Sequence, residues 1–414
     1  MENLIIDLND TVKWIGVKDP DLLTFDVVME TKYGTTYNSY FINAQKKTII
    51  DATKENFWEE YLMKIDELCD PRDIEYIVVN HTEPDHSGNV KNLLRLAPNA
   101  KVVGTGNAIR YLRDLMGMDF PNIVVKDGHT LDLGDRTLKF ISAPNLHWPD
   151  TMFTYLEEDK ILFTCDAFGA HFCDDNLFED EIERVSEYHE TFQYYFDVVL
   201  SPFSKFMLKA IEKIEDLEIE SIAPGHGPVL RKNWKKYVDL SKFYAERALT
   251  EPVKPVVFIP YVSAYQKTGM VAELIAKGIL QAGDIKVDVV DIEMSPLGEL
   301  EQHISNASAY VIGSPTINQN ILLPVYKCFA LINPIRDKGK PAAAFGSYGW
   351  SGEAKKLIRT NLENLKLDVF DEEMFVKFTP NDEESARAIA FGKAFGKTLL
   401  EHNIKTEQAV NEPG

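Results

Sequence analysis

Four side chains that can bind a metal ion lie within one short segment of the chain. They are His81, Glu83, Asp85 and His86. The segment follows an apolar run, residues 74–79, that is typical of a buried strand, and a helical pattern begins near Val90. The four side chains therefore stand at the C-terminal end of a predicted strand, where open α/β sheets place their ligand sites. Imidazole and carboxylate groups without a thiolate favour zinc, iron or manganese.

Further ligand-type residues also stand at the ends of apolar stretches. His147 lies in the sequence Leu-His-Trp-Pro-Asp, and His226 lies in Pro-Gly-His-Gly-Pro. Between them, a predicted strand over residues 161–165 ends at Asp166. A single histidine after a strand is usually an ordinary loop residue. The chain has only nine histidines, however, and so many ligand types at strand ends are hard to explain by chance. Together these segments supply enough ligands for two metal ions.

The pattern resembles the metallo-β-lactamase fold, whose signature is His-x-His-x-Asp-His followed by a later His, Asp and His. In this chain Glu83 stands where the hydrolases have their second histidine. A carboxylate in that place hardens the first site, and an oxygen-rich site suits iron better than zinc. With His147, Asp166 and His226 at their spacing, the first half resembles the flavodiiron proteins, also called A-type flavoproteins. The stretch around His147 is close to that family's form.

This resemblance implies a ligand set for two non-haem iron ions. One iron takes His81, Glu83 and His147. The other takes Asp85, His86 and His226, and Asp166 bridges the two. In some members of the family the histidine that matches His86 turns away from the metal.

Length and composition fit a globular protein with two domains. At 414 residues the chain can bury two separate cores. It has no long apolar run that predicts a membrane span, and its N-terminus does not resemble a signal peptide. Its four cysteines form no CxxC motif, which favours the reducing cytoplasm. A formal charge of −21 argues against a nucleic-acid partner, because phosphate binding needs a basic face.

The organisation of the chain changes near residue 250. Up to that point short strands alternate with helices, and the resemblance implies an αββα sandwich. The stretch from Thr250 to Pro255 has two prolines and little periodicity, so we place the linker there. We therefore expect a diiron domain over residues 1–250, a flavodoxin-like domain over 251–405 and a frayed tail over 406–414.

In the second half, a buried strand is followed three times by a loop rich in glycine and hydroxyl residues. The strand and loop pairs are 256–261 with 262–269, 309–312 with 313–318, and 342–345 with 346–352. They predict three loops at one edge of a doubly wound parallel sheet. Hydroxyls before a helix are often simple caps, but residues 254–400 resemble flavodoxin throughout. Flavodoxins hold the phosphate of FMN in such a loop at a helix N-terminus.

The flavodoxin resemblance implies a role for each loop. Ser263 and Thr268 should bind the phosphate, and Thr316 and Asn318 should face the polar edge of the flavin. Trp350 should lie against the isoalloxazine ring rather than in the core, because its glycine neighbours offer it no packing partners. The predicted FMN contacts are Ser263, Ala264, Tyr265, Gln266, Lys267, Thr268, Ser314, Pro315, Thr316, Ile317, Asn318, Ser347, Tyr348, Gly349, Trp350 and Gly352.

Three residues near the predicted ligands have an ordinary explanation as well as a functional one. Strand alternation should turn Cys165 away from Asp166 and into the core. His171 fits either an outer position in the metal pocket or a partly exposed polar site. Tyr195 matches a family tyrosine near the metals, but its aromatic neighbours favour simple helix packing.

Joined in one chain, the two halves indicate a redox enzyme, because simple hydrolysis has no use for a flavin. The resemblance implies reduction of dioxygen to water, or of nitric oxide to nitrous oxide, at a diiron site that FMN supplies with electrons. Dioxygen is favoured by analogy, because short members of the family are often oxygen scavengers. One alternative is a metallo-β-lactamase-type hydrolase with a fused flavodoxin module. Another is a sensor that binds either gas without turnover.

The resemblance also implies partners. The chain has no rubredoxin-like pair of CxxC motifs, so we expect a separate electron donor, namely rubredoxin, ferredoxin or a reduced deazaflavin. The chain has the family's domain order and a similarly short linker, so the resemblance implies a head-to-tail homodimer, or a tetramer of two such dimers. In that arrangement the FMN of one subunit lies beside the irons of the other.

Overall fold

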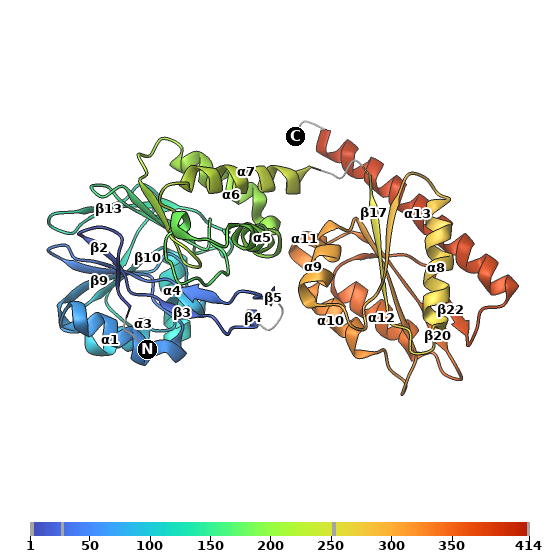
Figure 1. Cartoon of the computed structure of the whole chain (residues 1–414). Coiled ribbons are helices and arrows are strands. Elements are labelled where there is room, and N and C mark those ends of the chain that lie inside the picture. The colour runs from blue at the N-terminus through green and yellow to red at the C-terminus, as the bar shows by residue number, and fades with distance from the viewer. Residues whose placement is uncertain (1–3, 26–28, 251–253, 412–414) are drawn as a thin grey trace. The chain divides into compact units, whose positions relative to one another are not determined.

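The computed structural model of the chain describes residues 4–25, 29–250 and 254–411 (Figure 1). Residues 4–25 and 31–250 form one compact unit, and residues 29–30 and 254–411 form the other. Half of the predicted linker, residues 251–253, lies outside the described residues. Within the described part of the chain, no helix is long and apolar enough to cross a membrane.

The first unit is built on two large sheets. The seven-stranded sheet has the order β1 (Ile6–Asp7), β2 (Val12–Trp14), β7 (Tyr40–Ile42), β8 (Lys47–Ile50), β9 (Ile74–Val78), β10 (Lys101–Gly104) and β11 (Asn122–Val124). The five-stranded sheet has the order β12 (Thr130–Asp132), β13 (Thr137–Ser142), β14 (Met152–Leu156), β15 (Ile161–Cys165) and β16 (Ser221–Pro224). Two shorter strands, β3 (Val17–Asp19) and β6 (Thr35–Tyr37), pair with each other, and β4 covers Thr24–Phe25.

The two sheets pack face to face, with helices on their outer faces. Side chains such as Ile50 and Val78 from the first sheet meet Phe140 and Phe163 from the second in one buried core. The helices are α1 (Trp58–Leu68), α2 (Pro84–Ser87), α3 (Val90–Leu96), α4 (Gly106–Met116), α5 (Val185–Tyr195), α6 (Ser204–Ile214) and α7 (Trp234–Leu249). Residues of α1, α3 and α4 share a core with the seven-stranded sheet, and residues of α5, α6 and α7 share one with the five-stranded sheet. The unit is therefore the expected αββα sandwich.

Local sequence explains where these elements begin and end. Helix α4 begins after Thr105, whose hydroxyl accepts a hydrogen bond from the backbone N–H of Ala108. It ends at Gly117, which has a φ of 63° that glycine adopts without strain. Strand β9 is almost wholly buried, which explains its near-continuous run of apolar residues.

The second unit is a parallel sheet with helices on both faces. Its strands are β17 (Val256–Tyr261), β18 (Lys286–Asp291), β19 (Ala309–Pro315), β20 (Pro341–Tyr348), β21 (Asp368–Val369) and β22 (Met374–Lys377), and β5 covers Met29–Glu30. The order is β18-β17-β19-β20-β21, and β22 also pairs with β20. All the pairings are parallel.

The helices of this unit are α8 (Lys267–Leu280), α9 (Leu297–Asn306), α10 (Leu323–Leu331), α11 (Pro334–Asp337), α12 (Glu353–Asn364) and α13 (Asp382–Asn411). Residues of α8 and α13 share a core on one face of the sheet, and residues of α9, α10 and α12 share a core on the other. This is the doubly wound, flavodoxin-like sheet that the sequence predicted.

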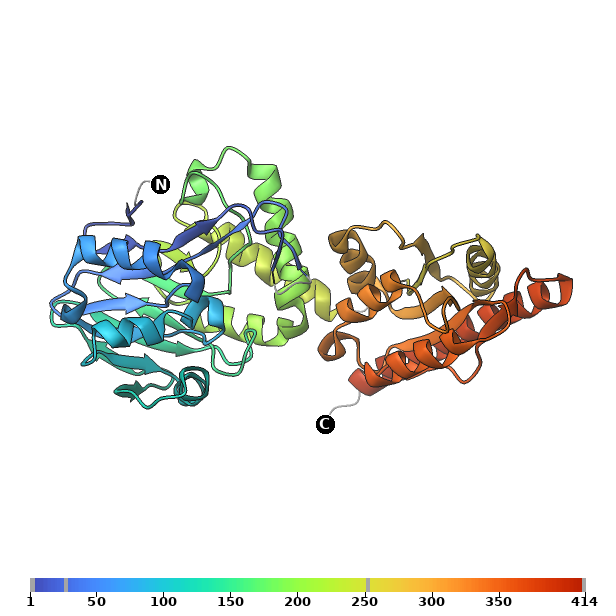
Figure 2. The same cartoon turned by 90° about the horizontal axis from the view of Figure 1, so that it is seen from below.

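The C-terminal part of the chain differs from the prediction. Helix α13, the long red helix of Figure 2, continues to Asn411 rather than fraying from Thr406. Glu407, Gln408 and Ala409 are good helix formers, so the helix has no local reason to stop at 406. Residues 412–414 of the predicted tail lie outside the described residues.

Candidate functional site

All seven predicted metal ligands come from segments that follow strands of the first unit. His81 and Glu83 follow β9, and the short helix α2 carries Asp85 and His86. His147 lies between β13 and β14. Asp166 follows β15, and His226 follows β16. The two sheets therefore both contribute side chains to the site.

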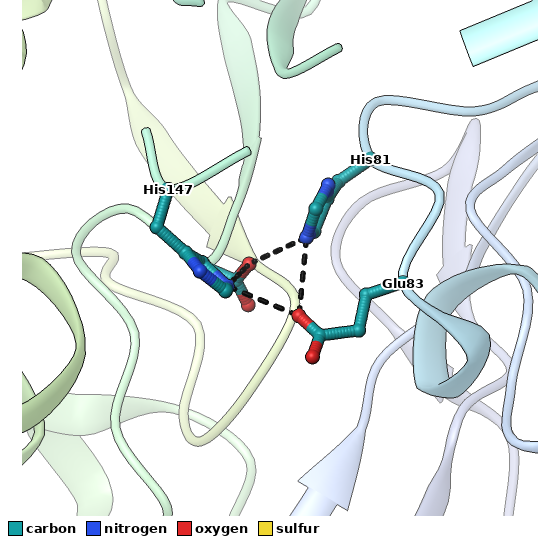
Figure 3. Close-up of side chains that lie close together, drawn as sticks. His81, Glu83 and His147 are labelled. Atoms are coloured by element: carbon teal, nitrogen blue, oxygen red, sulfur yellow. Dashed lines mark hydrogen bonds and ion pairs between the residues drawn. The ribbon is translucent and has the colours of Figure 1, made fainter. Parts of the chain in front are cut away.

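The first group of side chains converges on one point, and Figure 3 shows His81, Glu83 and His147 pointing toward one another. Glu83 Oε2 lies 3.2 Å from His81 Nε2 and 3.0 Å from His147 Nε2. Asp166 Oδ2 completes the group, at 3.5 Å from His81 Nε2 and 3.4 Å from His147 Nε2.

The second group lies on the other side of Asp166. Asp85 Oδ2 is 3.0 Å from His226 Nε2 and 3.3 Å from His86 Nε2. Asp166 Oδ1 is 3.0 Å from His86 Nε2 and 3.6 Å from His226 Nε2. His86 thus turns into the group rather than away from it, and the two oxygens of Asp166 face different groups.

These groups fit two metal ions. Ligand atoms about 2.1 Å from one ion, at roughly right angles, lie about 3 Å from one another, as they do here. Both oxygens of Asp85 and Oδ2 of Asp166 are buried, and they accept no hydrogen bond from any described residue. Buried carboxylate oxygens in a folded protein normally have a hydrogen-bond donor. Bound cations explain why these three do not.

Hydrogen-bond acceptors next to His81 and His226 determine which imidazole nitrogen of each ring faces the predicted metal site. Asp150 Oδ2 lies 3.4 Å from His81 Nδ1 and accepts hydrogen bonds from the N–H and the hydroxyl of Thr82, both at 2.8 Å. His226 Nδ1 donates to the carbonyl oxygen of Thr36 at 2.7 Å. With Nδ1 held by an acceptor, Nε2 of each ring is left to bind a metal.

The carboxylates also determine the electrostatics of the metal-free site. Burial opposes the charged imidazolium, but the hydrogen bonds that the His81 ring donates to Asp150 and Glu83 raise its pKa to about 10. Burial also lowers the pKa of His147, but the negative charges of Asp166 and Glu83 outweigh it and raise that pKa to about 10. Protons therefore occupy the ring nitrogens at neutral pH until a metal displaces them.

Tyr195 and His171 both lie against the two groups of predicted metal ligands. Tyr195 packs among buried aromatic residues, as expected, but its hydroxyl also donates to Asp166 Oδ1 at 3.1 Å. His171 is buried, its ring centroid is 4.5 Å from that of His226, and its Nδ1 lies 2.8 Å from the hydroxyl of Thr35. Of the two positions considered for His171, the one near the metals is therefore correct.

The prediction that Cys165 points away from Asp166 is wrong. Cys165 is buried, but its sulfur lies within 4.8 Å of ligand atoms of both His86 and Asp166. The register between β15 and β16 shifts between Phe163 and Cys165, and Cys165 has a φ of 49°. Simple alternation fails at such an irregularity.

The three flavin loops follow β17, β19 and β20, and their polar groups contact one another. The hydroxyls of Thr268 and Ser347 are 2.9 Å apart, and Ser263 Oγ accepts from the N–H of Gly269 at 3.2 Å. Gln266 has a φ of 59°, and helix α8 begins directly after it. A helix N-terminus behind a hydroxyl-rich loop is a suitable site for a phosphate.

The second and third loops are joined through Thr316. Its N–H donates to the carbonyl oxygen of Ser347 at 2.8 Å, and its hydroxyl accepts from the N–H of Ala354 at 3.3 Å. The hydroxyl therefore caps the start of α12 and keeps its own O–H as a donor. Trp350 is 91% exposed, which excludes the core position considered for it.

The remaining predicted FMN contacts differ in exposure. Ala264, Tyr265, Gln266 and Asn318 are exposed, Lys267, Ile317, Tyr348, Gly349 and Gly352 are half-buried, and Ser314 and Pro315 are buried. A hollow of about 740 Å³ adjoins Trp350, with Tyr348, Lys355 and Arg387 among its lining residues. No sequence pattern indicates this hollow.

Comparisons with known proteins match both units. Residues 35–227 match the family described as ODP family beta lactamase, and residues 259–392 match the flavodoxin family. The flavo-diiron protein FprA2 of Clostridium acetobutylicum is 38% identical over 403 residues, which cover 95% of this chain and 99% of that protein.

Two further relatives are named for a reaction. A nitric oxide reductase of Moorella thermoacetica is 33% identical, over 96% of this chain and 99% of that one. The solved structure of the rubredoxin oxygen:oxidoreductase of Desulfovibrio gigas has 29% identity and a TM-score of 0.78, and the match covers 96% of this chain and 99% of that chain.

Proposed function

Because the chain belongs to the flavodiiron proteins, we propose that it reduces dioxygen to water, with reduction of nitric oxide to nitrous oxide as a second activity. The chain is an oxidoreductase of the flavodiiron type, with FMN and a diiron site as its cofactors. The relatives do not support the hydrolase alternative. The observation that carries the proposal is that Asp166 directs one oxygen to each of two buried, carboxylate-rich groups.

We assign the seven side chains to the two irons as the sequence predicts. His81, Glu83 and His147 hold one iron, and Asp85, His86 and His226 hold the other. Asp166 bridges them. The support for this assignment is the convergence of the four Nε2 atoms on carboxylate oxygens at 3.0–3.6 Å.

The cofactors and the protein make different contributions to the reaction. When bound, two reduced irons and reduced FMN supply the four electrons that one dioxygen molecule needs to become two water molecules. Reduction of two nitric oxide molecules to nitrous oxide and water needs two. The protein keeps bulk water out, because the ligands Asp85, His86 and Asp166 are almost fully buried. Tyr195 holds a proton beside Asp166 at its hydroxyl.

The FMN site is assigned to the three loops of the second unit. Ser263, Thr268 and the N-terminus of α8 bind the phosphate, and Trp350 stacks on the isoalloxazine ring. The 91% exposure of Trp350 leaves the face of its ring free to stack on a flavin. Thr316 and Asn318 face the flavin's polar edge.

The proposal also covers the electron donor, the oligomeric state and the cellular compartment of the enzyme. The electron donor is a separate protein or cofactor, and the name of the Desulfovibrio relative makes rubredoxin the first candidate to test, before ferredoxin and reduced deazaflavin. The working unit is a head-to-tail homodimer or a pair of such dimers. The enzyme operates in the cytoplasm, in keeping with its four free cysteines.

Stopped-flow oxidation of the fully reduced protein tests the function. Protein from iron-replete cells should contain two irons per chain and be yellow from bound flavin. Mixing with dioxygen should reoxidise the irons and the flavin together without releasing peroxide, and mixing with nitric oxide should yield nitrous oxide. Zinc at full occupancy, or peroxide as the main product, would contradict the proposal.

A further inference from the structure

A buried carboxylate outside the ligand set lies directly behind the metal-binding segment. Asp51 follows β8, is 2% exposed, and uses both oxygens to hold one residue. Its Oδ1 accepts the N–H of Asn80 at 2.7 Å, and its Oδ2 accepts the side-chain amide of Asn80 at 2.9 Å. Asn80 directly precedes His81.

Asn80 also contacts the opposite sheet. Its Oδ1 accepts the hydroxyl of Thr154 at 2.6 Å, and its carbonyl oxygen accepts the N–H of Met152 at 2.9 Å. Thr154 and Met152 belong to β14 of the five-stranded sheet, whereas Asp51 and Asn80 follow strands of the seven-stranded sheet. The residue before His81 is therefore held from both layers of the sandwich.

The residues after Asp51 hold the other end of the metal-binding segment. Ala52 donates its N–H to the carbonyl oxygen of His86 at 2.7 Å, and Thr53 accepts the N–H of Asn89 at 3.1 Å. Asp51 itself has a φ of 53°. A residue other than glycine adopts this conformation at a cost, and such costs are concentrated where a functional geometry requires them.

We propose that Asp51 and Asn80 form a positioning pair that fixes His81 and His86 for metal binding, an inference that rests on the diiron centre proposed above. Neither residue touches a metal. The pair acts through its matched hydrogen bonds, because the carboxylate only accepts and the amide N–H groups only donate. Residues that orient metal ligands in this way commonly change metal affinity by about 10- to 100-fold when they are replaced.

An exchange of the two side chains tests the pair. In Asp51→Asn, an amide N–H₂ faces the N–H₂ of Asn80, so the second hydrogen bond is lost. In the double variant Asp51→Asn, Asn80→Asp, the amide of residue 51 donates to the carboxylate of residue 80. That carboxylate still accepts the hydroxyl of Thr154. The double variant thus keeps the net charge and all three hydrogen bonds.

Two measurements report on the metal rather than on turnover. They are the rate at which the protein loses iron to a chelator and the midpoint potential of the diiron centre. Asp51→Asn should lose iron about tenfold faster or more and shift the potential. The double variant should return both values close to those of the wild type. Two results would overturn the proposal. One is a single variant that loses iron at the wild-type rate, and the other is a double variant that loses iron as fast as the single variant does.

Asp159→Asn is the matched control. Asp159 also uses both oxygens, accepting from Asn9 at 2.8 Å and Arg136 at 2.7 Å, but it lies before β15 rather than after it. Its replacement should lower the denaturation midpoint without changing iron loss or the potential. If Asp51→Asn changes only the denaturation midpoint, as this control should, the pair is purely structural and the proposal fails.

A milder variant keeps the test open if Asp51→Asn does not fold. Thr154→Val removes only the hydrogen bond to Asn80, so iron loss should rise by a smaller factor, and wild-type iron loss would again overturn the proposal. Wild-type protein that holds a different divalent metal would count against the proposed function alone. The loss rate of that metal then tests the pair in the same way.

Discussion

The two oxygens of Asp166 face different ligand groups, Oδ2 toward His81 and His147 and Oδ1 toward His86. Asp166→Ala removes both contacts at once. We expect iron to fall from two per chain to one or fewer, with FMN content unchanged because the flavin loops belong to the other unit. Metal analysis and flavin absorbance measure this. Asp159→Ala is the control, and a variant with two irons and full dioxygen reduction would show that the bridge is misassigned.

A second prediction concerns pH. The pKa values of His81 and His147 in the metal-free protein are raised to about 10, above the unfolded-state value of about 6.5. Protonation therefore stabilises the metal-free fold fully below about pH 6.5, and this stabilisation is lost as the pH rises toward 10. Urea unfolding of chelator-treated protein from pH 6 to 9.5 should show a falling midpoint. The metal-loaded protein should not show that fall, and a flat profile for the metal-free protein would contradict the prediction.

Trp350 gives a third prediction. Trp350→Ala should weaken FMN binding about twofold to tenfold, the range expected for loss of an aromatic stacking contact, and leave the iron content unchanged. Trp350→Phe keeps an aromatic face and should recover most of the affinity. Fluorescence titration of the flavin-free protein with FMN measures both. Equal affinity in all three proteins would mean that Trp350 does not contact the flavin.

At the scale of single residues, sequence patterns indicate the ligands but not what holds them. His81, Glu83, Asp85 and His86 stand out because they follow one apolar run within six residues. Asp51 is a lone carboxylate after β8, and only the fold brings it to Asn80. Cys165 was misplaced because a local irregularity breaks the alternation that the prediction assumed.

At the scale of elements, helices α8 and α13 cross at two glycines. A Cβ atom on Gly278 would lie 2.0 Å from the carbonyl oxygen of Ile389, and one on Gly392 would lie 2.1 Å from that of Ile275. Gly392→Ala should therefore force the helices apart and cost about 1–3 kcal/mol, despite the better helix propensity of alanine.

The denaturation midpoint of the FMN domain measures this cost. Gly106→Ala, in α4 of the first unit, is the control for a helical glycine with room for a side chain, because a Cβ there meets only Val124 Cγ1 at 3.8 Å. It should leave the denaturation midpoint of the FMN domain unchanged and should not lower that of its own domain. An unchanged midpoint for Gly392→Ala would mean that the crossing can widen without cost.

Elements with strong periodicity or a continuous apolar run were predictable. The strands β9, β17, β19 and β20 begin within one residue of where the sequence places them, because each opens with a short apolar run. Strands β19 and β20 run on to Pro315 and Tyr348, so Ser314, Pro315, Ser347 and Tyr348, which the sequence placed in loops, lie on the strands. The close approach of α8 and α13 was not predictable. The two helices are far apart in the sequence and meet through the faces that carry glycine. One sequence alone does not show which helix faces contact each other.

At the scale of the whole molecule, the proposed dimer predicts complementation between two inactive variants. One subunit carries Asp166→Ala, and the other carries Ser263→Ala, Thr268→Ala and Trp350→Ala. Each variant alone should be inactive. In mixed dimers one site combines intact FMN with intact irons, so part of the activity should return on subunit exchange. Mixed dimers that form but stay inactive, or a fully active monomer, would contradict the head-to-tail arrangement.

The spread of the ligands along the chain has a consequence for the lifetime of the protein. Residues 81–86, 147, 166 and 226 follow four different strands, so two bound ions would join four distant chain segments much as covalent cross-links do. Each cross-link removes conformational freedom from the unfolded chain, and ligands that bind only the folded state protect it by mass action. Iron supply should therefore govern how long the first domain survives proteases as well as how fast it reduces its substrate. In a cell starved of iron, the amount of the enzyme would then fall as well as its activity.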